Sequence, residues 1–544
     1  MTLEQVYESV GGLGWFQYRV IAVITLIKAL TGWSMMMMAF AGLVPKFRCL
    51  TDTEEEGVDH PTAVIYDNLT LGQMWRNDSS SMDVCDINST ECSQYQFQGS
   101  ARSVVSEWDL VCDLKWVKPT ITSVQMAGVL VGAVLAGQSG DMFGRRTTNF
   151  GFFLLQMIFN IVAGFSVSWQ MFIILRFFIG FTIGGQLVVL VPYLTEFLPI
   201  MWRPLVSAVP MWPMGVVLFA GAAWLLEDWA YLHFGCAIFS APVLLTYFII
   251  PESPRWLAVQ GRLKEAHSVV EKMAAVNGAV VPPNTMDVIE EISIEATKSK
   301  KRGKKYSYFD IFNGFTVAKI TIIFGFQWCA ISIIFYGLSF GVASFSGNLY
   351  LNIALMALVE LPAYFATFFL VNSIGRRLST FGYFIIGCGA AFACVAVHYQ
   401  VSGSHKGTAI SALSLVAKMA SSGCWGATAT WVVESYPTVT RGVGYGFVNM
   451  TARIGAIIAP FALDLDYNFA MSYIIVGILQ VICLVLTLLL PETKGKSLPD
   501  NVRAAENDVN PSNGHQYGSV REEMDLHKTE NGDQTNLTTE EIKL

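Results

Sequence analysis

Long apolar stretches separated by short polar segments dominate the pattern along this chain. A window of about 20 residues with few charges is long enough to cross the roughly 30 Å hydrocarbon core of a bilayer. Such windows predict twelve transmembrane helices, at 20–42, 119–140, 148–167, 171–194, 205–226, 231–250, 320–341, 350–371, 378–398, 409–431, 443–463 and 470–490. The pattern therefore predicts an all-α membrane protein.

The overall composition supports this reading. The chain has 544 residues, of which 53% are hydrophobic and 14% are charged, and its mean hydropathy is +0.46. A soluble chain of this length would fold into several domains with charged surfaces. The formal net charge of -7 matters less than how charge divides between the two sides of the membrane.

The polar connections predict the orientation. The basic segments "DMFGRRT", "IMWRP" and "IGRRLS" fall on one side of the membrane, together with "KSKKRGKK" at 298–305. The opposite side receives the connection 43–118, which has thirteen acidic and six basic residues. Because basic loops stay in the cytosol, we expect cytosolic N- and C-termini in a multi-pass protein of the plasma membrane.

The connection 43–118 has the features of an extracellular loop. Its three sequons predict glycosylation at Asn68, Asn77 and Asn88. It also holds an even number of cysteines in an oxidising compartment, which predicts two disulfides with three possible pairings among Cys49, Cys85, Cys92 and Cys112. The loop is also a possible contact surface for a homo-oligomer.

An internal repeat of roughly 230–240 residues divides the chain into two halves. "GDMFGRR" at 140–146 returns as "VNSIGRR" at 371–377, and Glu252 has its counterpart in Glu492. Parallel six-helix repeats place a substrate cavity between the halves near the midplane of the membrane. The expected divisions are a cytosolic N-terminus 1–19, a first six-helix half 20–250, a cytosolic linker 251–319 with short helices, a second half 320–490 and a disordered cytosolic tail 491–544.

Charged residues recur at matching places on the cytosolic side of both halves. Glu196 and Arg203 stand seven residues apart, as do Glu434 and Arg441. Opposite charges at these places predict a latch that must break when the cytosolic side opens; the alternative is that they only set the topology. The predicted latch residues are Asp141, Arg145, Arg146, Glu196, Arg203, Arg376, Arg377, Glu434 and Arg441.

Several motifs resemble a known group of transporters. "GQSGDMFGRR" resembles the signature loop of the major facilitator superfamily, although Met142 stands where that loop usually has Arg. "SEWDLVC", "PESPRWL", "ESYPTVTR" and "PETKG" together resemble the organic cation/anion/carnitine transporter family, most closely its carnitine and organic anion branches. The resemblance implies the major facilitator fold and a secondary transporter of small organic ions that works by alternating access.

Cations within the predicted spans include Arg453, Lys418 and Lys28. Arg453 stands about 18 Å along a helix from Arg441, and Lys418 and Lys28 lie inside other apolar windows. A central cation costs about 2.5–3.5 kcal/mol on insertion scales, so it needs a partner or a ligand. A guanidinium can hold a carboxylate through two parallel hydrogen bonds. We therefore predict anion binding; the alternative is that these cations pair with internal groups such as Glu360.

Aromatic residues could form the rest of a substrate cavity. Their faces attract a quaternary ammonium group, although packing between helices explains them too. The candidates are Trp328, Phe335, Tyr336, Tyr364, Trp212 and Trp33. The family resemblance implies substrate contacts for Trp328 and Phe335, and an arginine at position 453 in anion and carnitine carriers, where cation carriers have Asp.

Organic anions, or zwitterions such as carnitine-like betaines, are the predicted substrates. A polyspecific cation carrier that uses Glu360 and a non-transporting glycosylated surface receptor are the alternatives. The sequence has no metal-ligand spacing, nucleophile motif or basic soluble domain, so we expect no enzyme, cofactor, metal or nucleic acid. Membrane lipids are expected partners. The coupling ion, Na⁺ or H⁺, or a counter-substrate, stays open.

Overall fold

The computed structural model describes residues 3–50, 94–99, 101–202, 211–302, 310–312, 314–403, 405–436, 441–463 and 469–494. Several predicted features lie outside these residues, namely the sequons at Asn68, Asn77 and Asn88, the cysteines Cys85 and Cys92, Arg203, and the tail from 495 onward. The side chains of Cys49 and Arg441 also lie outside the described part.

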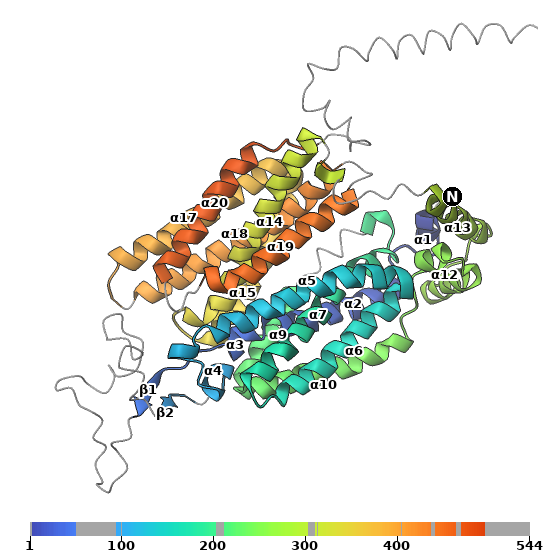
Figure 1. Cartoon of the computed structure of the whole chain (residues 1–544). Coiled ribbons are helices and arrows are strands. Elements are labelled where there is room, and N and C mark those ends of the chain that lie inside the picture. Colours follow the sequence, from blue (N-terminus) through green and yellow to red (C-terminus); the bar gives the residue numbers. More distant parts are fainter. Residues whose placement is uncertain are drawn as a thin grey trace, which may run out of the picture.

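Six long helices form the first half of the molecule (Figure 1). They are α2 (Trp15–Met36), α5 (Val117–Phe143), α6 (Arg145–Gly164), α7 (Trp169–Thr195), α9 (Met211–Leu226) and α10 (Trp229–Leu245).

Glycines let α5 and α7 approach closely. A Cβ atom on Gly132 would lie 1.9 Å from the carbonyl oxygen of Phe181, and one on Gly184 would lie 2.0 Å from that of Val129. Larger residues at these positions would force the helices apart.

The second half repeats this arrangement with one broken helix. Its helices are α14 (Phe315–Phe340), α15 (Leu349–Leu358), α16 (Glu360–Ser373), α17 (Arg376–Gln400), α18 (His405–Ser435), α19 (Arg441–Ala462) and α20 (Phe469–Leu488). The window 350–371 was predicted as one helix, but it divides at Val359 into α15 and α16. Pro362 explains the break, because it has no N–H for the carbonyl of Leu358, four residues earlier.

Nine helices of the described part are long and apolar enough to cross a membrane. The other three predicted windows are also helical, in α9, α18 and α19. Helix α9 has 16 residues in the described part, which is shorter than a full membrane span. Helices α18 and α19 carry many polar residues, including Lys418 and Arg453. The predicted architecture therefore matches the described helices, and nine of the twelve spans meet both criteria of length and hydropathy.

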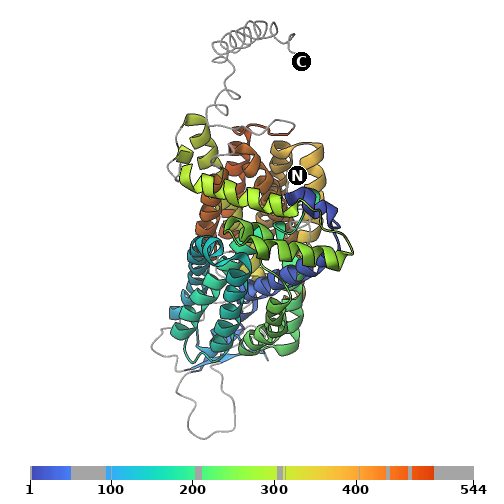
Figure 2. The same ribbon diagram turned by 90° about the vertical axis from the view of Figure 1, so that its right-hand side faces the viewer.

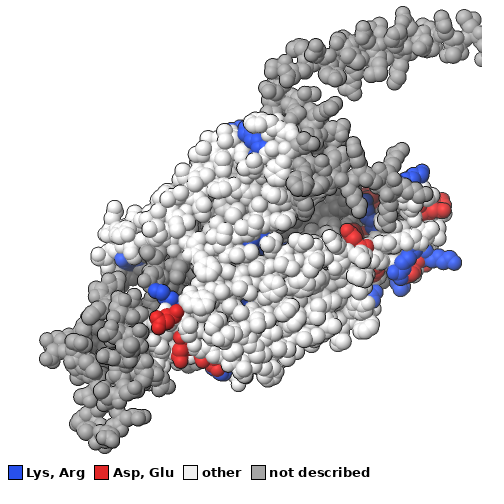
Figure 3. Space-filling model, in the orientation of Figure 1, with Lys and Arg blue, Asp and Glu red and all other residues white. Residues whose placement is uncertain are grey.

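The two ends of the bundle carry different small elements (Figures 1 and 2). At the end that we call the loop end lie α3 (Met38–Ala41), α4 (Val104–Glu107) and the antiparallel strands β1 (Phe47–Leu50) and β2 (Gln94–Phe97). At the opposite end, the linker end, lie α1 (Leu3–Ser9), α11 (Pro254–Val259), α12 (Leu263–Asn277) and α13 (Thr285–Arg302). Charged side chains gather at both ends, whereas the flank between them is almost uncharged in the face that Figure 3 shows.

Asn277 joins the N-terminal segment to the linker helices. Its amide nitrogen donates to the carbonyl of Val10 and to Gln17 Oε1, both at 3.0 Å. Its amide oxygen accepts a hydrogen bond from the backbone N–H of Phe16, also at 3.0 Å. Gly14 contacts this amide too closely for any side chain, since a Cβ there would lie 2.3 Å from Asn277 Cγ. The segment "GGLGWFQ" is thus fixed to the end of α12.

The sequence repeat has a structural basis at the linker end. Glu252 accepts hydrogen bonds from the backbone N–H of Arg146, at 3.0 and 3.2 Å, at the start of α6. Glu492 accepts the equivalent bonds from Arg376 and Arg377, at 3.0 and 2.9 Å, at the start of α17. A carboxylate is favourable at a helix N-terminus, which has free N–H groups and a positive partial charge.

These backbone bonds also set the ionisation of Glu492. Partial burial alone raises the pKa of its carboxyl group, but the N–H groups of Lys494, Arg376, Arg377 and Thr493 outweigh burial and hold the pKa below its ordinary value. The turn before each capped helix is a glycine with positive φ, 100° at Gly144 and 102° at Gly375. Both turns therefore need glycine for their backbone conformation as well as for the approach of the carboxylate.

The cysteines divide by location. Cys112 is disulfide-bonded. The six cysteines of the helices are free, namely Cys236, Cys329, Cys388, Cys394, Cys424 and Cys483. The pairing among the four loop cysteines stays a prediction.

Candidate functional site

The two halves contact each other near the loop end. Ser123 Oγ on α5 donates to the carbonyl of Ile457 on α19 at 2.6 Å. The Tyr350 ring on α15 stacks on Phe40 at 6.0 Å between centroids, and its hydroxyl lies 3.4 Å from Glu227. Toward the linker end, the helices of the two halves diverge, and the surface between them is recessed (Figures 1 and 3).

Five of the predicted latch residues form ion pairs, and each pair lies within one half. Arg145 lies 2.6 Å from Asp141 and 3.4 Å from Glu196. In the second half, Arg376 forms a bidentate pair with Glu434, at 2.7 and 2.8 Å. Partial burial raises the pKa of the Glu196 carboxyl group, and Ser253 and Arg145 oppose that shift. Among the described residues, these pairs hold the helices of one half together and do not bridge the two halves.

The second arginine of each "GRR" turn has a different partner. The guanidinium of Arg146 lies 4.0 Å from the centroid of the Tyr247 ring. Arg377 Nη2 donates to the carbonyl of Leu488 at 2.6 Å. Both side chains therefore attach the start of one helix to the end of the last helix of the same half.

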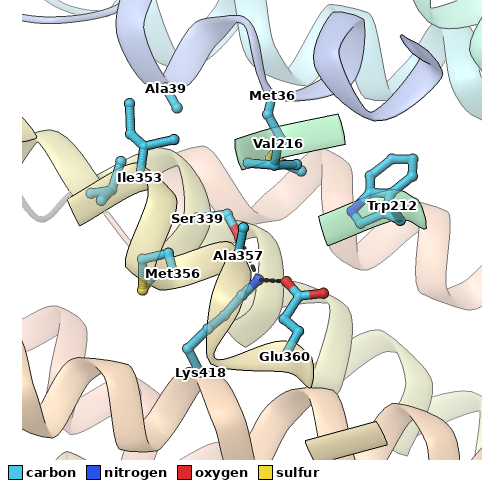
Figure 4. Close-up of a pocket in the computed structure, with 11 residues that line it drawn as sticks. Met36, Ala39, Trp212, Val216, Ser339, Ile353, Met356, Ala357, Glu360 and Lys418 are labelled. Atoms are coloured by element: carbon cyan, nitrogen blue, oxygen red, sulfur yellow. Dashed lines mark hydrogen bonds and ion pairs between the residues drawn. The ribbon is translucent and has the colours of Figure 1, made fainter. Parts of the chain in front are cut away.

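A small pocket lies between the halves (Figure 4). Helices α2, α3 and α9 form one wall, and α14, α15, α16 and α18 with the turn after α14 form the other. Its lining is mostly apolar, and only Ser339, Glu360 and Lys418 bring polar side chains into it; the remaining lining residues are Met36, Ala39, Trp212, Val216, Val342, Ile353, Met356 and Ala357. Its volume is about 20 Å³, which suits one water molecule and is too small for an organic ion.

Lys418 has a complete set of partners in this pocket. Its Nζ lies 3.2 Å from Glu360 Oε1, donates to Ser339 Oγ at 2.6 Å and to the carbonyl of Phe335 at 3.3 Å. The same nitrogen lies 3.0 Å from the centroid of the Phe335 ring. Lys418 and Glu360 are 1% and 3% exposed. All three N–H groups are thus used, and the two buried charges cancel.

Arg453 lacks such a neutralising partner. Its side chain is partly buried on α19, and its Nη1 donates to the hydroxyl of Tyr336 at 3.2 Å. The ion pairs of the described residues do not include Arg453. Tyr336 contacts Phe335 at 5.3 Å between ring centroids, so contacts link Arg453 to the Lys418 pair. The guanidinium keeps donors for a further ligand.

The remaining candidates lie around these two cations. Tyr364 donates to Glu360 Oε2 at 3.5 Å. Trp328 is buried, and Trp425 lies between it and Phe335, with ring centroids 5.5 and 5.9 Å away. These contacts, together with Trp212 in the pocket wall, bring together all the predicted substrate-binding residues of the second half with one from the first.

Lys28 and Trp33 occupy other places on α2. Lys28 lies one turn before Gly32, where a Cβ atom would lie 3.2 Å from the backbone of Trp212. Residues four apart share a helix face, so Lys28 lies on the face toward α9, one turn closer to the linker end. It is half-buried and has no ion pair within the described part. Trp33 packs against Phe219 and Phe239 and does not line the pocket.

Two polar or aromatic contacts of the site were not predicted. Ser339 holds Lys418, and Trp425 joins Trp328 to Phe335. A signal for Ser339 exists, because it follows Phe335 by four residues and so shares its helix face. No group of three potential metal-binding side chains is found in the described part of the chain.

Comparison with known proteins places the chain in a family. Residues 20–502 match the family described as "Sugar (and other) transporter". An organic cation transporter protein of Drosophila melanogaster is 29% identical, with 93% of this chain and 95% of that protein covered. Solute carrier family 22 member 7 of Bos taurus is also 29% identical, with coverage of 94% and 97%. The organic cation/carnitine transporter 2 of Mus musculus is 27% identical, with coverage of 92% and 93%.

Solved structures agree on the fold. The inward-open xylose transporter XylE from E. coli superposes with a TM-score of 0.62 at 16% identity, over 89% of this chain and 98% of that one. The predicted major facilitator fold is confirmed, because the chain also superposes on XylE described as a major facilitator superfamily proton:xylose symporter. The predicted absence of enzymatic activity is confirmed as well, because the matched family and the relatives are transporters. The chain therefore belongs to the sugar (and other) transporter family, as a multi-pass membrane transporter whose relatives include an organic cation transporter protein and an organic cation/carnitine transporter.

Proposed function

We propose that this protein is a plasma-membrane secondary transporter of organic anions or zwitterions, such as carnitine-like betaines, that works by alternating access. The proposal rests on one observation, namely that two cations between the halves differ in whether a carboxylate pairs with them. Lys418 is neutralised by Glu360, whereas the hydrogen bond of Arg453 within the described residues is with the neutral hydroxyl of Tyr336. A substrate carboxylate is the partner that completes the Arg453 site.

The charge balance supports the same substrate class. With Lys418 and Glu360 paired, Arg453 leaves one positive charge without an ion pair among the described residues of the second half. A low-dielectric cleft lined by one sign of charge raises the local concentration of the opposite ion. The rings of Phe335, Tyr336 and Trp328 add faces for the apolar or ammonium part of a ligand.

The alternative cation carrier needs an acidic group that is open to substrate. Glu360 is the one carboxylate that lines the pocket, and Lys418 and Tyr364 contact both of its oxygens. To reach Glu360, an organic cation would have to displace the Lys418 ammonium, which also has partners in Ser339 and the carbonyl of Phe335. This arrangement favours anions and zwitterions over simple cations.

The proposed orientation puts the linker end in the cytosol and the loop end outside the cell. In this orientation the structure is closed toward the outside, through the contacts of α5 with α19 and of α9 with α15, and diverges toward the cytosol. The described ion pairs of Arg145 and Arg376, each within its own half, agree with an open cytosolic side.

The orientation can be tested at "KSKKRGKK", residues 298–305. Its six basic residues are expected to stay in the cytosol. There, the attraction between each basic side chain and the anionic lipid headgroups contributes roughly 1 kcal/mol of binding free energy. An epitope tag inserted after Lys305 should bind antibody only after the cells are permeabilised. A tag inserted at Gly57, in the loop with the sequons, serves as the opposite control. Staining of the Lys305 tag on intact cells would show that this segment lies outside the cell and would contradict the proposed orientation.

Uptake measurements test the substrate class. Cells that express the protein should accumulate labelled carnitine or an amphipathic aryl anion above the level of untransfected cells, and should not accumulate tetraethylammonium. Each uptake is measured with and without Na⁺ and at two external pH values, which also identifies the coupling ion. Accumulation of tetraethylammonium alone would overturn the proposal in favour of a cation carrier. Surface expression without uptake of any compound would favour a receptor.

A further inference from the structure

A fourth intramembrane cation lies inside the first half, outside the pocket between the halves. The side chain of Arg176 on α7 is fully buried. Its Nη2 donates to Gln125 Oε1, but Nε and Nη1 have no hydrogen-bond partner among the described residues. The ion pairs of the described part do not include Arg176. An arginine stays charged in proteins, so this burial leaves both a charge and two donors uncompensated.

One aromatic ring lies beside this guanidinium, and a cluster of rings continues from it. Its Cζ lies 5.9 Å from the centroid of Phe172, and Phe172 in turn lies 5.3 Å from Trp229. Trp229 is 1% exposed, and its indole N–H has no partner among the described residues either. Trp108, from the motif "SEWDLVC", packs on both Phe172 and Trp229 at 5.5 and 5.3 Å. Three buried donor nitrogens without a partner among the described residues, two of Arg176 and one of Trp229, are thus connected through the ring of Phe172.

The neighbouring histidine does not supply the missing negative charge. His233 Nδ1 lies 2.9 Å from Asn160 Oδ1. The Asn160 amide nitrogen donates to Ser34 Oγ and to the carbonyl of Gln156, so its oxygen must accept. His233 therefore donates through Nδ1, and its buried Nε2 has no hydrogen-bond partner among the described residues. A histidine carries no negative charge in either protonation state, so it does not balance the charge of Arg176.

We infer that Arg176 and Trp229 bind a small monovalent anion of the halide type, such as chloride. Arg176 and Trp229 offer N–H groups that have no acceptor among the described residues, and Arg176 adds one positive charge that a single negative charge balances. The edges of aromatic rings carry a partial positive charge and suit a weakly hydrated ion. A divalent anion would leave a net charge of about −1 at the site after it balances the single positive charge of Arg176. This remaining buried charge argues against sulfate or phosphate.

The location of the site separates it from the substrate cavity. Arg176 lies seven residues after the start of α7 at Trp169, about 10 Å from the loop end. The pocket between the halves is lined by other residues, including Lys418 and Glu360. The bound anion neutralises Arg176 and stabilises the packing of α5, α7 and α10, and this role does not depend on which substrate is carried.

Thermal unfolding of the purified full-length protein tests the site. Tm is measured in sodium gluconate, with gluconate replaced stepwise by chloride or bromide at constant ionic strength. Saturating halide should raise Tm by about 2–4 °C, because a ligand that binds only the folded state stabilises it. In Arg176→Gln the halide response should vanish. In Trp229→Phe, which keeps the ring and removes one donor, the half-saturating chloride concentration should rise several-fold.

Lys272→Gln, a change at an exposed lysine of α12, is the control and should keep the full halide response. Arg453→Gln is measured as well, because Arg453 is the other intramembrane arginine without an ion pair among the described residues, and most of the halide response should persist in it. A response that persists in Arg176→Gln, or one that Arg453→Gln abolishes, would overturn the assignment. So would a wild-type protein that ignores halide, in which case water satisfies the donors. If Arg176→Gln does not accumulate, Trp229→Phe decides, because an unchanged half-saturating concentration there contradicts the site.

Discussion

Replacing Arg453 with Asp is expected to abolish uptake of carboxylate substrates while the protein still reaches the cell surface. The side chain is partly exposed, and its hydrogen bond to the hydroxyl of Tyr336 is with a neutral group. Reversal of its charge therefore breaks no internal ion pair among the described residues. It does place a carboxylate against the substrate carboxylate. Loss of a desolvated charge pair costs about 2–5 kcal/mol, so uptake should fall at least about 30-fold.

A conservative change at the same position separates charge from geometry. Arg453→Lys keeps the cation but loses the two parallel donors of the guanidinium, so KM for a carboxylate should rise by roughly 10-fold. Uptake is measured for both variants and normalised to biotinylated surface protein. Lys272→Asp, an exposed charge reversal on α12, is the control and should behave as wild type. An unchanged KM in Arg453→Asp would rule out a role in substrate binding.

Much of the fold was predictable because a membrane span has a distinctive amino-acid composition. Lipid offers no hydrogen-bond partners to the backbone, so apolar windows of sufficient length must be helices. The repeat was equally visible, since Glu252 and Glu492 cap equivalent helices through the same backbone contacts. The break at Val359 was not predicted, although Pro362 was a signal for it. An apolar window predicts that a segment is buried in lipid, but it does not predict where the backbone hydrogen bonding of that segment is interrupted.

The site was less predictable than the fold. The sequence indicated which intramembrane residues are charged, but a pair such as Lys418 and Glu360 is separated by 58 positions. Which charges meet depends on how helices pack, and helix spacing alone does not specify it. Arg176 was overlooked although it lies in the apolar window 171–194, as Arg453 lies in 443–463. The same rule, that a charge in a span needs a partner, applied to both.

The buried pair of Lys418 and Glu360 should behave as a unit. We expect Glu360→Gln and Lys418→Met to lower surface protein and thermal stability when made singly, because each leaves one uncompensated charge at a position that is nearly fully buried. Removing one member of a buried pair typically costs about 3–5 kcal/mol. The double variant carries no charge at either position, so it should recover most of the lost surface protein.

Transport by the double variant then shows what the pair does beyond folding. Lys418 Nζ already has partners in Glu360, Ser339 and Phe335, so we place substrate binding at Arg453. The double variant should consequently take up carboxylate substrates with a KM within about threefold of wild type. Ser339→Ala, which removes a single neutral partner of Lys418, is the control for local repacking and should lower stability only by about 1–3 kcal/mol. A double variant that reaches the surface in normal amount and transports nothing would move Lys418 and Glu360 from the scaffold into the substrate site.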